Sequence, residues 1–196
     1  LGTSYSGTID FKGGGFRQGS SSSADYSPYF SDASNQQYKI YVNSGSGIIY
    51  ADALASPDGT FELSEGDLQL SGANTYSGKT TVSGGSLKLL AATGSIQSSE
   101  VNVADGAVFE INLPSASDTA TYSNVISGAG SFLKSGAGEL TFGEVQTYSG
   151  STTISDGKLK TNSSGSLSSS TAVSVNSGAT YELGSDDEVA SISGSG

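Results

Sequence analysis

A short passage occurs twice in this chain, and the repetition limits what the chain can fold into. Residues 75–89 read TYSGKTTVSGGSLKL, and residues 147–160 read TYSGSTTISDGKLK. Tyr76 recurs as Tyr148, 72 positions later. The same offset relates Leu68 to Leu140, Val82 to Ile154, Leu87 to Leu159, Val103 to Val175 and Glu110 to Glu182. A chain that repeats itself over segments of this length is expected to stack similar structural units.

Each copy also contains a shorter period. Three glycines recur at the same two intervals in each copy, namely Gly66, Gly85 and Gly106, and Gly138, Gly157 and Gly178. The pieces between them alternate apolar and polar residues, as in KTTVS and SLKLL, which is the pattern of β-strands. No long segment has apolar residues at helical spacing. The sequence therefore predicts an all-β chain, a parallel β-helix (β-solenoid) with about 20–24 residues per rung.

The bends in the repeat have a competing interpretation. Gly-Gly and Asp-Gly pairs at 84–85, 105–106 and 156–157 lie between alternating strands, and Asp-Gly is a strong hairpin signal. A stack of antiparallel hairpins, as in a sandwich or barrel, is the alternative fold. We favour the solenoid because the same bend returns at the same interval in both copies, a regularity that a sandwich does not require. In a solenoid, Val82 lies next to Val103 and Ile154 next to Val175.

The charged residues offer a separate check on stacked rungs. If the apolar side chains of successive rungs point inward, Lys88 lies outward beside Glu110, and Lys160 lies outward beside Glu182. The two pairs have the same separation in the sequence. Opposite charges on neighbouring strands stabilise a sheet by about 0.2–1 kcal/mol, and exposed pairs lie at the low end of that range. The spacing of the charges thus agrees with rungs of this length.

The composition argues against several classes of function. The formal net charge is -11, which disfavours binding to nucleic acid or anionic lipid. The chain has no Cys, no Met, no His and no Trp, and its only arginine is Arg17. Without His or Cys, the usual zinc and haem sites and the Ser–His and Cys–His catalytic pairs cannot form. We expect a protein that is not an enzyme and that has no metal, no cofactor and no nucleic-acid partner.

The chain divides into two parts by composition. Residues 1–60 hold six of the ten tyrosines and a low-complexity run rich in Gly and Ser, and we expect atypical N-terminal rungs or a cap there. Residues 61–196 hold the repeats, with units at about 66–137 and 138–196. We expect the second unit to continue beyond residue 196, because VASISGSG at the end of the sequence echoes VISGAGSF at 125–132.

Residues 135–160, SGAGELTFGEVQTYSGSTTISDGKLK, resemble the passenger-associated repeat of bacterial autotransporters. The repeat positions that carry the resemblance include Tyr76, Gly78, Val82, Gly85 and Leu87 in the first copy, and Tyr148, Gly150, Ile154, Gly157 and Leu159 in the second. The chain departs from the pattern at Glu65, where a small residue is usual, and at Gln146, which stands where the first copy has Asn74. Neither departure disturbs the strand pattern.

The resemblance implies a secreted passenger with a right-handed parallel β-helix, exported by type V secretion through a C-terminal outer-membrane β-barrel that these residues do not include. It implies a location outside a Gram-negative bacterium, secreted or at the cell surface, with membrane contact only through that barrel. In the family, such repeats are scaffold associated with secretion and folding, and the activity usually lies elsewhere. Passengers include adhesins, toxins, proteases and esterases, so the fold alone does not name the task.

Two classes of function remain to be weighed. The first is an adhesin or structural stalk, a virulence-type role in which the partner is a host-surface glycan, a host protein or a second copy. The second is a carbohydrate-active β-helix enzyme or a toxin fragment. An enzyme of this kind needs paired carboxylates, and Asp186 and Asp187 are the candidates. We favour the interpretation that these two acids belong to a solvated turn.

The aromatic residues of the N-terminal part are the candidates for ligand binding. Tyr26, Tyr29, Phe30 and Tyr38 cluster in sequence, and aromatic rings stack on sugars and fill protein pockets. The alternative is that these rings cap the end of the solenoid core. Replacing Tyr26, Tyr29 and Phe30 by Ala separates the two interpretations. Unchanged melting with lost adhesion favours binding, whereas a lower melting temperature favours capping.

Overall fold

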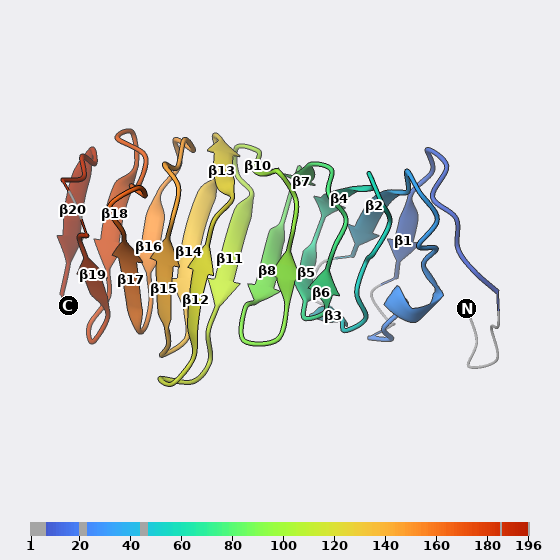
Figure 1. The fold of residues 1–196 in the computed structure, drawn as a ribbon, viewed down its shortest axis with the longest axis horizontal. Helices are drawn as coiled ribbons and strands as arrows, with labels where there is room; N and C mark the ends of the chain where they lie inside the picture. Colours follow the sequence, from blue (N-terminus) through green and yellow to red (C-terminus); the bar gives the residue numbers. More distant parts are fainter. Residues whose placement is uncertain (1–6, 20–22, 44–46, 185, 196) are drawn as a thin grey trace.

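The structure is a computed structural model of the chain, and it describes residues 7–19, 23–43, 47–184 and 186–195. The chain forms an elongated parallel β-solenoid of about eight turns, with the N-terminal turns at one end and the C-terminal turns at the other (Figure 1). In the part of the chain that is described, the only helix is the short 3-10 helix η1 (Ser27–Tyr29). None of the described helical residues forms a segment long and apolar enough to cross a membrane.

The strands lie on three faces, named here in the order in which the chain visits them. The first face holds β1 (Phe16–Gln18), β2 (Gln37–Val42), β4 (Thr60–Glu65), β7 (Thr80–Val82), β10 (Glu100–Val103) and β13 (Val125–Gly128). The second face holds β3 (Ile48–Tyr50), β5 (Asp67–Leu70), β8 (Ser86–Leu90), β11 (Val108–Asn112), β14 (Ser131–Ser135), β16 (Thr152–Ile154), β18 (Ala172–Val175) and β20 (Ser191–Gly194). The third face holds β6 (Ala73–Asn74) and β9 (Ser95–Ile96) in one sheet, and β12 (Thr119–Tyr122), β15 (Glu139–Phe142), β17 (Lys158–Thr161) and β19 (Thr180–Glu182) in another.

All pairings between the described strands are parallel, which confirms the predicted solenoid and rules out the hairpin alternative. Paired residues are separated by as few as 19 positions, as for Leu63 and Val82, and by as many as 25, as for Val103 and Gly128. The rungs are therefore slightly more variable in length than the sequence predicts.

The alternation of apolar and polar residues accounts for the core. On the second face, Leu68, Leu87, Phe109 and Phe132 pair in turn and form one buried column. Parallel strands stacked in register place like residues above one another, so each rung continues the apolar column of the rung before it. The predicted neighbours Val82 and Val103, and Ile154 and Val175, are paired as expected.

The predicted ion pairs are also present. Lys88 pairs with Glu110 across neighbouring strands of the second face, with 3.1 Å between the ammonium nitrogen and the carboxylate. Lys160 pairs with Glu182 on the third face at 2.9 Å. The charges outside the solenoid thus follow the same register as the apolar columns inside it.

The two copies of the repeat do not lie on the same faces. Val82 belongs to β7 on the first face, whereas Ile154, its counterpart, belongs to β16 on the second face. Leu87 lies on the second face, and its counterpart Leu159 lies on the third. The offset between the copies therefore spans three turns and one additional face.

The N-terminal part of the chain joins the solenoid through its strands. β1 and β2 extend the first face, and β3 extends the second, each in parallel register with the next turn. Where the structure describes residues 1–60, they therefore include turns of the same solenoid.

Candidate interaction surface

The repeated TYSG turn places a tyrosine in the core with a fixed hydrogen-bond partner. Tyr76 and Tyr148 are fully buried. The Tyr76 hydroxyl shares a hydrogen bond with the Thr80 hydroxyl at 2.8 Å, and the Tyr148 hydroxyl does the same with Thr152. Burial raises the pKa of both tyrosines, so each hydroxyl stays protonated at neutral pH. The Tyr-x-x-x-Thr spacing thus encodes a hydrogen bond inside the core. The sequence analysis did not predict this bond, although it named both tyrosines as repeat residues.

The glycines of the repeat are needed for close backbone contact. A Cβ atom at Gly78 would lie 2.5 Å from the carbonyl oxygen of Gly59, and one at Gly150 would lie 2.2 Å from that of Gly130. Gly85 has a φ of +73°, which side chains other than glycine rarely adopt. The repeat glycines and the buried Val82, Leu87, Ile154 and Leu159 therefore build the scaffold and leave little to contact a ligand.

A buried polar side chain closes the turn just before each of the two tyrosines. The Asn74 side chain accepts a hydrogen bond from the backbone amide of Leu54 at 2.9 Å and donates to two carbonyls. The Gln146 side chain accepts one from the amide of Ile126 at 2.7 Å and also donates to carbonyls. The exchange of Asn for Gln between the copies therefore preserves the hydrogen-bonding function at this position.

Asp187 plays a related part in a later turn. Its carboxylate accepts a hydrogen bond from the backbone amide of Leu167 at 3.0 Å and another from the Tyr181 hydroxyl. This contact raises the pKa of Tyr181, after the larger effect of burial. Asp186 is exposed. One of the two candidate catalytic carboxylates is thus engaged with the scaffold. That the chain is not an enzyme stays a prediction.

The structure separates the four aromatic candidates for ligand binding. Phe30 is 6% exposed and Tyr38 is 0% exposed, and the Tyr38 hydroxyl donates to the carbonyl of Ser31 at 2.7 Å. Phe30 packs edge-on against Tyr50, with ring centroids 5.3 Å apart. Tyr26 and Tyr29 are partly exposed. The two buried rings belong to the core, as the cap interpretation expects, and ligand binding remains a prediction for the two partly exposed tyrosines.

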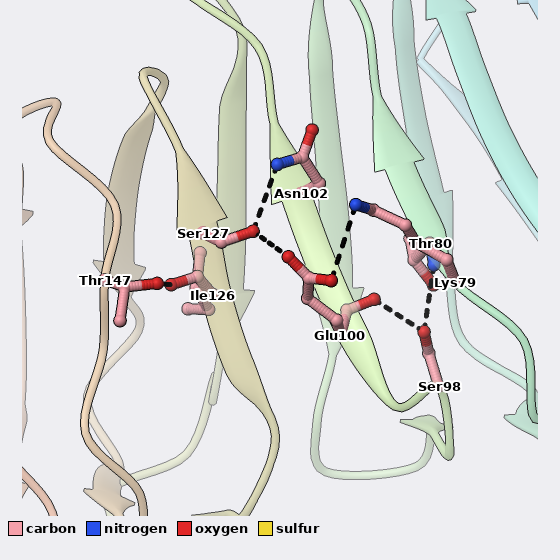
Figure 2. A network of polar contacts seen from close by, with 8 residues as sticks. All are labelled: Lys79, Thr80, Ser98, Glu100, Asn102, Ile126, Ser127 and Thr147. Carbon is pink, nitrogen blue, oxygen red and sulfur yellow. Dashed lines mark hydrogen bonds and ion pairs between the residues drawn. The ribbon is translucent and has the colours of Figure 1, made fainter.

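Cross-rung polar contacts cover the outside of the first face, and Figure 2 shows one network of them. The Glu100 carboxylate on β10 accepts a hydrogen bond from the Ser127 hydroxyl on β13 and pairs with Lys79 at 3.4 Å. The Asn102 side chain donates to the Ser127 hydroxyl at 3.0 Å. The hydrogen bond from Ser127 above all, and then the Lys79 ammonium, lower the pKa of Glu100. The network therefore links three successive turns through their outward side chains.

The same figure shows how the network meets the scaffold (Figure 2). The Ser98 hydroxyl donates to the carbonyl of Glu100 at 2.7 Å and accepts a hydrogen bond from the backbone amide of Thr80 at 2.9 Å. The Thr147 hydroxyl donates to the carbonyl of Ile126 at 3.4 Å. At Ser98 a hydroxyl side chain thus takes the place of a backbone partner, whereas the Thr147 hydroxyl adds to the bond that its own backbone amide donates to the same carbonyl.

The third face has a ladder of alternating charge. Lys158 pairs with Glu139 at 3.3 Å and with Glu182 at 2.9 Å, and Glu182 also pairs with Lys160. Hydrogen bonds from the two lysines hold the pKa of Glu182 at about 2. Both signs of charge alternate along this face, so it presents no strong single-sign field.

The second face changes character along its length. Toward the N-terminal end its outward residues include Asp67, Lys88 and Glu110. From β14 to β20 the outward residues are uncharged and mostly carry hydroxyls, and they are Ser131, Leu133, Ser135, Thr153, Ala172, Ser174, Ser191 and Ser193. We call this region the hydroxyl face. Parallel register places its hydroxyls in columns, with Thr153 next to Ser174 and Ser174 next to Ser193.

One lysine lies inside the solenoid. Lys134 is 0% exposed and stands between Ile111 and Ile154 in an inward column of the second face. Its ammonium donates to the carbonyl oxygens of Ser135 at 2.9 Å, Gly136 at 2.6 Å and Asp156 at 3.1 Å. Burial lowers the pKa of Lys134, an effect that nearby Asp156 partly offsets. The three carbonyls are what allow an ammonium group at this depth.

The parallel solenoid and its twice-repeated Tyr-Ser-Gly turn define the class of fold, a β-helix that carries two copies of one repeat. Residues 63–89 and 132–160 match the family model of the passenger-associated-transport-repeat, which confirms the resemblance at both copies. The repeats and the fold together fit a segment of an autotransporter passenger. A search of curated proteins and a search of solved structures each gave no significant match.

Proposed function

We propose that this chain serves as an adhesive or structural stalk segment of an autotransporter passenger that is secreted or displayed on a Gram-negative cell. The partner is a host-surface glycan, a host protein or a second copy of the chain. The observation that carries the proposal is the hydroxyl face, because it offers regularly spaced hydrogen-bonding groups along four turns. Many weak contacts of this kind add up when two surfaces meet along their length.

The distribution of charge supports the choice of this face. With a formal net charge of -11, two copies of the chain repel each other at long range. The outward side chains of β14, β16, β18 and β20 carry no charge, so contact there brings no like charges together. The Ser131 hydroxyl of this face lies 3.1 Å from that of Ser151, the residue just before β16, and it can exchange this hydrogen bond for one with a partner.

The proposal is tested by adding charge to the hydroxyl face. Thr153 and Ser174 are changed together to Glu, and Ala116 and Ser177, which are exposed turn residues, are changed together to Glu as a matched control. Sedimentation over a range of concentrations measures self-association. Bacteria displaying each variant are scored for aggregation and for adhesion to epithelial cells. We expect the Thr153/Ser174 variant to lose at least one of these activities and the control to keep them.

If the two variants behave alike in all three assays while both stay folded by circular dichroism, the hydroxyl face is not the adhesive surface. If the unchanged chain neither self-associates nor adheres, the adhesive role fails and the scaffold role alone remains.

A further inference from the structure

Asp-Gly pairs stand at several bends of the solenoid, and such a pair can react with itself. The amide nitrogen of the glycine attacks the side-chain carboxyl carbon of the aspartate, because a glycine has no Cβ to crowd that nitrogen. A folded chain permits the reaction only where both groups are free to meet. The pairs in this chain are Asp58–Gly59, Asp105–Gly106 and Asp156–Gly157.

The pair at the corner between β10 and β11 is free of contacts. The Ala107 amide donates to the carbonyl of Ala104 at 3.0 Å and closes a turn around Asp105 and Gly106, which are both exposed. Gly106 has a φ of +77°, and no atom lies within 4 Å of the place where a Cβ would stand. Among the described residues, neither the Asp105 carboxylate nor the Gly106 amide has a hydrogen-bond partner. Nothing in the fold therefore holds the two reacting groups apart.

The pair at residues 58–59 is held in place. Gly59 is buried, and its amide donates to the carbonyl of Ser56 at 3.0 Å. A Cβ at Gly59 would lie 2.7 Å from the Ser56 side chain, so there is little room for the glycine to move. To attack the Asp58 carboxyl group, this nitrogen has to give up its hydrogen bond and leave its packing.

The pair at residues 156–157 is held on both sides of its peptide bond. The Asp156 carbonyl accepts a hydrogen bond from the Lys134 ammonium at 3.1 Å. Gly157 packs so closely that a Cβ there would lie 2.4 Å from the carbonyl oxygen of Gly138. The Gly157 amide does donate to the Asp156 carboxylate at 2.8 Å, but this contact presents the hydrogen to the carboxylate and not the nitrogen that must attack. Ring closure therefore requires this corner to open locally.

We propose that Asp105–Gly106 is a site of spontaneous covalent modification, at which the aspartate passes through a succinimide to isoaspartate. In the first step the Gly106 nitrogen bonds to the side-chain carbon of Asp105, and the carboxyl hydroxyl and the amide hydrogen leave together as water. In the second step water adds to a carbonyl of the succinimide ring and breaks its bond to nitrogen. Attack at the former main-chain carbonyl gives isoaspartate, in which the chain continues through the side-chain carbon. Water is the only other reactant.

The strands on both sides of the corner are fixed independently of it. The Ala104 amide donates to the carbonyl of Val82 at 2.8 Å, and the Val108 amide donates to that of Gly85 at 3.0 Å. Isoaspartate adds one carbon to the main chain between these anchors, so we expect the corner to change its shape while the fold persists. The site is separate from the hydroxyl face, and the reaction does not depend on the adhesive role.

The first test follows the reaction with oxygen-18. The folded chain is incubated in mildly acidic water enriched in this isotope, because a protonated carboxyl group loses water most readily. Each passage through the succinimide leaves one labelled oxygen in the product, which digestion in ordinary water and tandem mass spectrometry locate. We expect position 105 to take up label at least about fivefold faster than positions 58 and 156, which react only through local opening.

Two controls accompany this test. In concentrated urea, which removes the fold, the three pairs are expected to take up label at similar rates. In Asp105→Glu the labelling at position 105 is expected to disappear, because a six-membered ring closes far more slowly. A protein isoaspartyl methyltransferase, which methylates isoaspartate and not aspartate, shows that the labelled product at position 105 includes isoaspartate.

The second test introduces the reaction elsewhere. Ser177, at the exposed corner between β18 and β19, is the counterpart of Asp105 in the second copy. The Ala179 amide donates to the carbonyl of Asn176 at 3.0 Å, and Gly178 has a φ of +82° with no atom within 4 Å of a Cβ. We expect Ser177→Asp to take up label at position 177 at a rate within about threefold of that at position 105, because the two corners have the same geometry. Ser177→Glu adds the same charge and is expected to take up none.

Three results would overturn the proposal. They are no uptake of label at position 105 in the folded chain, equal uptake at the three pairs in the folded chain, and no uptake at position 177 in Ser177→Asp. Circular dichroism confirms that each variant is folded. The comparison of the three pairs uses the unchanged chain, so it remains decisive if a variant fails to fold.

Discussion

The two copies of the repeat, residues 63–89 and 132–160, use similar sequences in different places of the solenoid. The first copy begins on the first face and ends on the second, whereas the second copy begins on the second face and ends on the third. Both copies keep a buried tyrosine that is hydrogen-bonded to a threonine. Both also keep a polar side chain that accepts a hydrogen bond from a backbone amide. The repeat therefore encodes a turn and its internal hydrogen bonds, and it does not encode a position around the axis.

The copies differ most at the bend that precedes the glycine of the G-x-L-x-[LF] segment. In the first copy, Leu63 is the last inward residue before Gly66, three positions later. In the second, Lys134 is the last inward residue before Gly138, four positions later. The bend with the additional residue has carbonyls within reach of the Lys134 ammonium, which explains how a lysine is accommodated where the other copy has a leucine.

The largest expected effect comes from removing either repeat tyrosine. Tyr76→Ala and Tyr148→Ala each delete a fully buried ring, and we expect each to lower the free energy of unfolding by about 3–5 kcal/mol. Urea denaturation measures the change. Val145→Ala, at an exposed site in the second copy, is the control and is expected to change stability by less than about 0.5 kcal/mol. A small loss at only one tyrosine would show that the copies are not equivalent in packing.

A smaller effect distinguishes the hydrogen bonds of the two tyrosines. The Thr152 hydroxyl forms hydrogen bonds with the Tyr148 hydroxyl and, at 2.9 Å, with the Thr171 hydroxyl. Tyr148→Phe therefore leaves Thr152 with one hydrogen-bond partner. In the first copy, Tyr76→Phe deprives the buried Thr80 hydroxyl of the bond at 2.8 Å. We expect Tyr76→Phe to lower the free energy of unfolding by about 1–3 kcal/mol and Tyr148→Phe to lower it by about 0.5–1.5 kcal/mol, as measured by urea denaturation. Equal costs would contradict the role given to Thr171.

The difference between Lys134 and Leu63 is tested through pH. The folded-state pKa of Lys134 is lowered, so between that pKa and the unfolded value of 10.5 the unfolded chain binds more protons. This lysine therefore makes stability rise with pH across that interval. We expect Lys134→Met to lose this contribution and Leu63→Met, the matched change in the other copy, to keep it. Denaturation midpoints between pH 7 and 10 check the prediction, which fails if the two variants have parallel pH profiles.

The smallest expected effect concerns the ladder on the third face. The pKa of Glu182 is held at about 2, so the ion pairs stabilise the folded state above the ordinary value of 4.5, and this contribution is lost as pH falls toward 2. We expect Glu182→Gln to flatten the acid limb of the stability profile and to reduce its dependence on salt. Glu144→Gln, at an exposed site of the second copy, serves as the control. If the two variants had superimposable profiles of stability against pH, the ladder would add nothing measurable to the stability of the fold.

Much of the fold can be predicted from the sequence because successive turns of a parallel solenoid have similar lengths and the same alternation of apolar and polar residues. The neighbours Val82 and Val103, and the ion pair of Lys88 with Glu110, follow from strand alternation and a nearly constant rung length. The rotation between the copies does not follow, because it depends on bends of unequal length and on β12, the first strand of the four-stranded sheet on the third face.

The sites are less predictable than the fold for a related reason. The Tyr76 and Thr80 bond is local and could be read from a Tyr-x-x-x-Thr spacing inside the repeat. The carbonyls around Lys134 come from two different turns, and β9 and β12, which lie in successive turns of the third face, do not pair. Such features arise from defects in the repeat, and a pattern of regular spacing contains no signal for them.

The rotation of the second copy is tested most directly by disulfide formation, since the chain contains no cysteine of its own. Paired residues on neighbouring strands are about 4.8 Å apart, within the range that a disulfide spans. Thr153 pairs with Leu133 on the second face, whereas its counterpart Thr81 lies on the first face, the face of Ser127. Under mild oxidation, the Leu133→Cys/Thr153→Cys variant is expected to form the bond in high yield, and the Ser127→Cys/Thr153→Cys variant is not. Bond formation between positions 127 and 153, and not between 133 and 153, would contradict the account.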